Sequence, residues 1–130
     1  RAGVTSVLDL TAEFSAPPAF RKLVYLNLPI LDLTAPNLAQ LEEMVHFISR
    51  EAERGVVYVH CKIGYSRSAA AVAAYLLQSG CASSVAESIS RLRAARPSIV
   101  VRPEVHRALV EFEQNIRKDF VLASNEPSPF

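Results

Sequence analysis

The sequence predicts an α/β fold in which helices flank a small, mostly parallel central sheet. Three observations indicate this fold class. Short apolar segments rich in β-branched residues alternate with a long helical pattern in the first half of the chain. Helical patterns follow one another in the second half, and a polar loop joins the last apolar segment to the next helix. With 130 residues, half of them apolar, the chain has the size of one domain with its own core.

Three apolar segments are predicted to be strands. Residues 4–10 and 23–28 are short and aliphatic, and the Ala-Pro-Pro-Ala sequence at 16–19 between them excludes a continuous helix. Residues 56–59, Val-Val-Tyr-Val, form an uninterrupted apolar run of the kind found in a parallel strand that is buried on both faces. We therefore expect this third strand to be central in the sheet.

Two helices are predicted around the third strand. The segment from Pro36 to Gly55 carries apolar residues at helical spacing, which predicts a helix of about five turns with Gly55 as its C-cap. Residues 68–78 are rich in alanine, and small side chains allow a buried helix to pack closely against its neighbours.

Two more helices are predicted toward the C-terminus. Ser84 and Glu87 form a capping-box pattern at the start of the first one. Pro103 begins the second, which carries a stripe of apolar residues. The predicted domain therefore covers residues 1–118, and residues 119–130, which end in a Pro- and Ser-rich sequence, are expected to form a flexible tail.

The composition excludes several classes of function. The 14 basic and 13 acidic side chains give a net charge of +1 and are interspersed along the chain, so we expect no basic face and no nucleic-acid partner. Two cysteines, Cys61 and Cys81, are too few for a disulfide framework and lack a metal-binding spacing, which indicates a reducing compartment. No apolar segment reaches the roughly 20 residues that cross a bilayer, so this piece is predicted to contain no transmembrane segment.

The residues that carry chemistry form one loop, from His60 to Ser68. A cysteine six residues before an arginine is weak evidence by itself, but here a strand pattern leads directly into Cys61 and a helix pattern begins at Arg67. A short loop with Gly64 near its middle can curl so that its backbone N–H groups point at one centre. The helix N-terminus adds positive potential. The loop therefore predicts a phosphate-binding site.

The same surroundings predict how the loop would act on a phosphate ester. Its N–H groups favour a negative sulfur at Cys61, whereas a free thiol is ionised only to about a few per cent at neutral pH. Arg67 offers a planar fork that binds two phosphate oxygens at once and stabilises the transition state. Ser68 is placed to donate its hydroxyl to the sulfur when a phosphocysteine is hydrolysed.

A thiolate nucleophile also needs an acid that protonates the leaving group. The chain has three aspartates. Asp9 lies at the end of the first predicted strand, and Asp119 lies beyond the last predicted helix. Asp32 follows the second strand and precedes the long helix, which places it at the same edge of the sheet as Cys61. Asp32 is therefore the predicted general acid, with a loop-capping aspartate as the alternative.

These residues resemble the dual-specificity branch of the protein tyrosine phosphatase superfamily. Residues 60–68 match that family's HCxxGxxRS loop and 95–99 its later Arg-Pro element, and the resemblance extends from Gly3 to Glu113. The chain departs from the family in two places. A strand that usually precedes Gly3 is absent, which indicates a domain trimmed at its N-terminus. Val-Val-Arg at 100–102 stands where many members have a Pro-Asn pair.

The resemblance implies a tyrosine-phosphatase-like fold and a cysteine-dependent phosphatase activity. It implies that Cys61 is the nucleophile, Arg67 the phosphate-binding arginine and Ser68 the hydroxyl that aids turnover. Asp32 would be the general acid on a mobile loop, and His60 would orient the loop without taking a proton from the substrate. Neither a metal nor a cofactor is implied.

The remaining residues of the loop are predicted to contact the substrate. The predicted substrate-binding residues are Lys62, Ile63, Gly64, Tyr65 and Ser66. A lysine after the cysteine also occurs in lipid-directed relatives, but these often carry a second basic residue where Tyr65 stands. The sequence therefore leaves a phosphoprotein and a phospholipid or phosphoinositide as equal alternatives.

The loop also resembles that of bacterial proteins in which such a domain is fused to a membrane-embedded phosphatase-like domain. This implies a longer, membrane-anchored chain, with the present domain in the cytoplasm at the inner face of the membrane. Two other functions remain open. One is a catalytically silent phosphate-binding module, and the other is a rhodanese-type sulfurtransferase, which uses a cysteine in a rounded anion loop without a separate acid.

Residues outside the loop have simpler interpretations. Cys81 is interpreted as a plain cysteine, with a redox partner for Cys61 as the alternative. His46 and His106 are interpreted as packing or surface residues. Arg102 is either a solvated arginine or a contact to a substrate headgroup.

Overall fold

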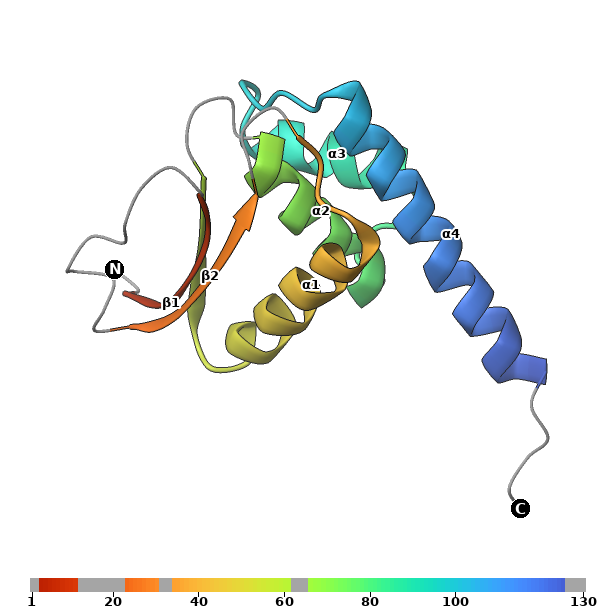
Figure 1. Ribbon diagram of the computed structural model, residues 1–130, viewed down its shortest axis with the longest axis horizontal. Helices are drawn as coiled ribbons and strands as arrows, with labels where there is room; N and C mark the ends of the chain where they lie inside the picture. Colours follow the sequence, from red (N-terminus) through yellow and green to blue (C-terminus); the bar gives the residue numbers. More distant parts are fainter. Residues whose placement is uncertain (1–2, 12–22, 31–33, 62–65, 126–130) are drawn as a thin grey trace, which may run out of the picture.

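The computed structural model describes residues 3–11, 23–30, 34–61 and 66–125, with side chains up to residue 118. It confirms the predicted α/β fold, with the elements in the expected order (Figure 1). The strands are β1 (Val4–Thr11), β2 (Val24–Ile30) and β3 (Val56–His60). The helices are α1 (Leu38–Ala52), α2 (Ser66–Ser79), α3 (Val85–Ala95) and α4 (Pro103–Asn125).

The strands form a parallel sheet whose order among the described residues is β2-β1-β3. β1 is the central strand, and all its residues from Ser6 to Thr11 are buried. Among the described strands, β1 rather than the expected segment 56–59 is therefore central. Within the described part of the chain β3 pairs on one side only, and its residues Val56 and Tyr58 are 41% and 42% exposed. An apolar run shows that a strand can be buried, but pairing depends on residues far away in the sequence.

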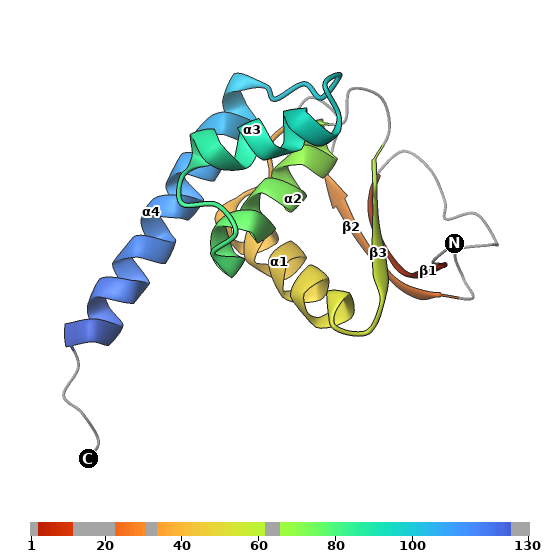
Figure 2. The same ribbon diagram turned by 180° about the vertical axis from the view of Figure 1, so that it is seen from behind.

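All four helices lie on one face of the sheet, as the two opposite views show (Figures 1 and 2). Leu8 and Leu10 of β1 belong to the core on this face, and α2 packs against α1, α3 and α4. The side of α2 that enters the core consists of alanines, each at most 1% exposed: Ala69, Ala70, Ala71, Ala73 and Ala74. Such small side chains allow close approach of the helix to its neighbours, as the sequence predicted.

A reciprocal capping box begins α1. The Asn37 side chain accepts a hydrogen bond from the Gln40 N–H at 2.8 Å, and the Gln40 side chain accepts one from the Asn37 N–H at 2.9 Å. The helix therefore starts after Pro36 and has 15 residues, which is about four turns rather than the predicted five. Glu53, not Gly55, is its C-cap, so that part of the prediction is wrong.

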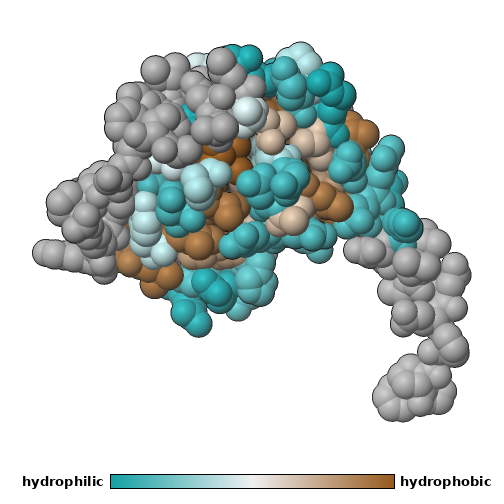
Figure 3. Space-filling model, viewed as in Figure 1, coloured by the Kyte–Doolittle hydropathy of each residue, from teal (hydrophilic) through white to brown (hydrophobic). Residues whose placement is uncertain are grey.

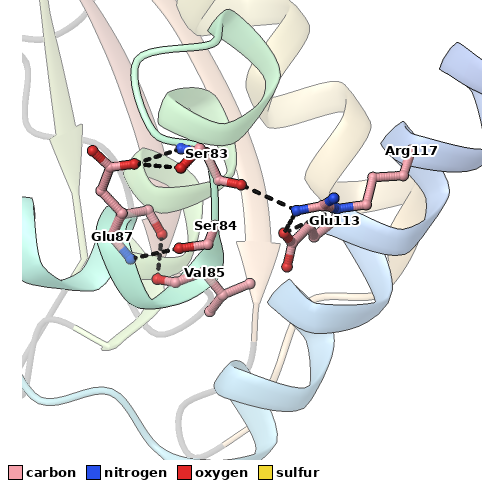
Figure 4. A network of polar contacts seen from close by, with 7 residues as sticks. Ser83, Ser84, Val85, Glu87, Glu113 and Arg117 are labelled. Carbon is pink, nitrogen blue, oxygen red and sulfur yellow. Dashed lines mark hydrogen bonds and ion pairs between the residues drawn. The ribbon is translucent and has the colours of Figure 1, made fainter.

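Serine and glutamate side chains begin α3 (Figure 4). Ser84 Oγ accepts a hydrogen bond from the Glu87 N–H at 3.1 Å, as the capping-box pattern predicts. The Glu87 carboxylate does not close the box on Ser84; it accepts from the Ser83 N–H and hydroxyl at 2.7 and 2.8 Å. These bonds from Ser83 lower the pKa of Glu87. Arg117 of α4 donates to Glu113 of the same helix at 2.7 Å and to the Ser83 carbonyl at 3.2 Å, and the second bond ties α4 to the segment that leads into α3.

The last helix is longer than predicted. α4 continues through Asp119 to Asn125, so the predicted boundary after residue 118 falls inside a helix. The helix continues because no glycine or proline interrupts the sequence between Pro103 and Pro127. In the described part of the chain, no helix is long and apolar enough to cross a membrane.

The close approach of Gly55 to β1 gives a prediction about stability. A Cβ at position 55 would lie 2.8 Å from Thr5 Cγ2 and would also overlap Thr5 Oγ1. Since overlap in a packed site costs about 1–3 kcal/mol, Gly55→Ala should lower the free energy of unfolding in urea by about that amount. Adding Thr5→Ala should restore most of the loss. A loss that Thr5→Ala does not reduce would contradict this explanation.

Candidate active site

The predicted loop connects the carboxyl end of β3 to the N-terminus of α2. His60 is the last residue of β3, Cys61 follows it, and α2 begins at Ser66. Four of the predicted substrate-binding residues lie outside the described residues: Lys62, Ile63, Gly64 and Tyr65. A strand end followed directly by a helix N-terminus is the usual place for an anion in an α/β sheet.

The sulfur of Cys61 has two hydrogen-bond donors on Ser68. The Ser68 hydroxyl lies 2.8 Å from Cys61 Sγ, and the Ser68 backbone N–H lies 3.4 Å from it. Cys61 is half-buried and packs against the hydrophobic core. Two donors that point at one sulfur stabilise a negative charge on it. The structure thus brings Cys61 and Ser68 together, as the spacing predicted.

Arg67 joins the loop to a different strand. Its side chain is 3% exposed, and Nη1 donates a hydrogen bond of 2.7 Å to the backbone carbonyl of Ile30, the last residue of β2. The bond fixes the guanidinium at the edge of the sheet where β2 and β3 both end. The sequence analysis missed Ile30, because every residue has a backbone carbonyl and no sequence pattern marks this one.

His60 and Cys61 belong to opposite faces of the sheet. Cys61 packs with Val57 and Val59 against the core, whereas His60 stacks beside Tyr58, with ring centroids 5.7 Å apart. The Tyr58 hydroxyl also lies 3.4 Å from His60 Nδ1. Alternate residues of a strand point to opposite faces, so the imidazole and the sulfur point away from each other. This placement fits an orienting role for His60 rather than proton transfer.

The three aspartates have different surroundings. Asp32 lies outside the described residues, but Ile30, two residues before it, contacts Arg67. Asp119 lies in α4, 16 residues after Pro103, which corresponds to about 24 Å along the helix axis. This distance argues against Asp119 as the acid of the loop.

Asp9 is buried in a hydrogen-bond cluster of its own. Its Oδ1 accepts from the Thr11 N–H at 3.0 Å and from the Thr11 hydroxyl at 2.7 Å, and its Oδ2 accepts from the Tyr25 hydroxyl. Burial, followed by the hydrogen bond and the charge of Asp9, raises the pKa of Tyr25 to about 12. Both Asp9 oxygens therefore have partners inside the sheet, which indicates a structural residue.

The segment between α3 and α4, residues 96–102, lies against the loop. A cavity of about 300 Å³ is lined by Cys61 and Ser68 on one side and by Arg96 and Ile99 on the other. The backbone N–H of Arg102 also lies 3.4 Å from Ser66 Oγ, at the first residue of α2. The segment therefore contacts the site at two places.

Comparison with known proteins agrees with this geometry. The family model for the dual specificity phosphatase catalytic domain matches residues 1–115. Mouse phosphatidylglycerophosphatase and protein-tyrosine phosphatase 1 is 42% identical over 93 residues, which cover 70% of this chain and 48% of that protein. The chain thus spans about half the length of this curated relative.

Solved structures of phosphatases have the same fold as this chain. The crystal structure of PTPMT1 in complex with PI(5)P has a TM-score of 0.78 and 32% identity, covering 90% of this chain and 81% of that one. The crystal structure of human DUSP28 has a TM-score of 0.81 and 28% identity, covering 91% and 82%. With a family model that covers most of the sequence and a fold that agrees with solved members, this chain belongs to the dual specificity phosphatase family.

Proposed function

We propose that the chain is a phosphomonoester hydrolase that works through a phosphocysteine on Cys61. The observation that carries the proposal is the pair of Ser68 donors on Cys61 Sγ, 2.8 and 3.4 Å away, next to the buried Arg67. Membership of the dual specificity phosphatase family supports the same reaction.

In the first step the Cys61 thiolate attacks phosphorus, and the P–O bond to the leaving group breaks. Arg67 binds two of the phosphate oxygens and balances their charge in the transition state. The Asp32 carboxylic acid donates its proton to the leaving oxygen, so an alcohol departs rather than an alkoxide. The bond from Arg67 to Ile30 supports this assignment, because Ile30 is only two positions before Asp32 in the sequence.

In the second step water attacks the phosphocysteine. The Asp32 carboxylate takes a proton from the water, the S–P bond breaks, and inorganic phosphate leaves. The Ser68 hydroxyl donates a hydrogen bond to the departing sulfur and makes it a better leaving group. His60 orients the loop from the opposite face of the sheet.

The substrate is bound by the side chains of the loop and presented to Cys61 as a phosphate ester. We assign this role to Lys62, Ile63, Gly64, Tyr65 and Ser66. The names of the relatives include both a protein-tyrosine phosphatase and a phosphatidylglycerophosphatase, so a phosphoprotein and a phospholipid both fit. We place the domain in the cytoplasm at the inner face of a membrane, as part of a longer membrane-anchored chain.

Two alternatives receive less support. A rhodanese-type sulfurtransferase does not fit the match to the dual specificity phosphatase family. A silent phosphate-binding module would not need a hydroxyl 2.8 Å from the sulfur, since that donor acts on the leaving thiolate rather than on bound phosphate.

Cys61→Ser should abolish hydrolysis. Turnover of nitrophenyl phosphate should fall by more than about 10³-fold, because a serine hydroxyl is not ionised in the loop. Cys81→Ser is the matched control and should keep the full rate, since Cys81 is exposed and lies beyond the far end of α2. Retained turnover in Cys61→Ser would overturn the proposed function.

Ser68→Ala should slow the second step more than the first. Loss of a hydrogen bond to a charged sulfur should reduce steady-state turnover by about 10- to 100-fold. Rapid mixing should then reveal a burst of nitrophenol equal to the enzyme concentration, because phosphocysteine accumulates. Ser79→Ala, at the other end of α2, is the control. A slow first step without a burst would contradict the role given to Ser68.

Asp32→Ala should slow hydrolysis most for substrates whose alcohols are poor leaving groups. The kcat/KM for an alkyl phosphate should fall by about 10²- to 10⁴-fold, whereas kcat/KM for nitrophenyl phosphate should fall much less, because kcat/KM reports the first step, in which nitrophenolate needs no proton. Asp119→Ala provides an aspartate control distant from the loop. Equal losses on the two substrates would exclude Asp32 as the general acid.

A further inference from the structure

The charges of the chain are distributed less evenly along the sequence than the small net charge suggests. Residues 91–107 contain five arginines and one glutamate, a balance of +4. The rest of the chain has nine basic and twelve acidic side chains, a balance of −3. The small net charge therefore conceals a basic region, and the expectation that the charges are interspersed along the chain does not hold for residues 91–107.

The fold gathers these residues around the segment that joins α3 to α4. We call residues 96–102 the arginine loop, because Arg96 and Arg102 stand at its ends. Arg93 in the last turn of α3 and His106 in the first turns of α4 line one hollow of about 420 Å³ together with Val101 of the loop. Figure 3 shows hydrophilic residues over the start of α4, with apolar residues beside them.

Two of these cations have no counter-ion among the residues that the structure describes. Within the described residues, neither Arg93 nor Arg102 has a carboxylate at ion-pair distance. Arg91, by contrast, lies 3.7 Å from Glu87. Arg93 is exposed, so its charge is available to a partner outside the chain.

The middle of the arginine loop is apolar. Ile99 and Val101 pack against the core, and Val100 between them is 52% exposed. The arginine loop therefore combines one exposed aliphatic side chain with nearby arginines, and a membrane interface can bind both kinds of side chain. The apolar side chain enters the headgroup region, and the cations bind lipid phosphates around it.

The arginine loop is adjacent to the nucleophile. Arg96 and Ile99 line the cavity that also contains Cys61 and Ser68, and the Arg102 backbone contacts Ser66. Anything that binds on the loop therefore lies beside the catalytic sulfur.

We infer that the arginine loop docks on an anionic bilayer and that the lipid phosphate esters of this bilayer are the substrates. The inference rests on the proposed function and chooses between its two substrate classes. An acidic protein segment would account for the cations but not for the exposed Val100. A bilayer surface accounts for both, and for cations that are spread over two helices and a loop.

Cosedimentation of the inactive Cys61→Ser protein with lipid vesicles tests docking without turnover. Vesicles of phosphatidylcholine with about one-third phosphatidylglycerol should bind the protein at least about tenfold more tightly than pure phosphatidylcholine vesicles. Binding should weaken as salt is added, because the attraction is electrostatic.

Substitutions in the basic region should weaken binding to the anionic vesicles. We expect a loss of about fivefold for Arg93→Gln, which removes one exposed cation, and at least about tenfold for Val100→Asp, which replaces the apolar tip by an anion. Arg54→Gln is the matched control, because Arg54 is exposed at the opposite end of β3 and Glu51 keeps its closer partner Arg50 at 2.9 Å. This control should bind like the parent protein.

Hydrolysis of soluble nitrophenyl phosphate separates this inference from the proposed function. With Cys61 present, Arg93→Gln and Val100→Asp should both keep the parent rate on this substrate and lose activity on lipid phosphates in anionic vesicles. Equal binding to the two kinds of vesicle, or stronger binding to an acidic phosphopeptide than to vesicles, overturns the inference and leaves a phosphatase. No hydrolysis by the parent chain overturns the proposed function and, with it, the role of docking.

Discussion

The hydrogen bond from Arg67 to the carbonyl of Ile30 holds the candidate site together, because it joins two segments that are 37 residues apart in sequence. A buried guanidinium without partners would cost several kcal/mol. The backbone carbonyl of the buried Ile30 also needs a donor. The bond gives the carbonyl a donor and one of the five guanidinium N–H groups an acceptor, and such a bond to a charged group is worth about 1.5–3 kcal/mol. It connects the segment that leads to Asp32 with the helix that carries Ser68.

The two faces of the sheet contribute in different ways. The face that carries the helices is apolar and holds Cys61 against the core. The opposite face carries polar side chains at the same end of the strands, among them Asp9 with Tyr25, and His60 with Tyr58. Asp9 and His60 are in register across β1 and β3. The polar contacts on one face therefore hold the ends of β1 and β3 in place, while the apolar face holds the sulfur of Cys61.

The sequence predicted local features well and long-range pairing poorly. Strands and helices followed from periodicity, and the contact between Ser68 and Cys61 followed from a strand, a short loop and a helix in succession. The central position of β1 among the described strands did not follow, because an apolar run does not reveal its neighbours. The basic region at residues 91–107 was missed because the charge was averaged over the whole chain. The roles of Asp32 and of Lys62 to Tyr65 stay predictions, since these residues lie outside the described part of the chain.

The alanine side of α2 links the packing of the core to the electrostatic potential at Cys61. The positive potential of a helix N-terminus falls off within about one turn, so its effect on Cys61 depends on where the helix axis lies. That position is determined by methyl groups packed against the sheet and the other helices, with no space for a larger side chain. A larger residue at Ala70 or Ala74 would displace the helix and change the field at the sulfur without touching a substrate. Reactivity and packing in this domain therefore cannot be optimised independently.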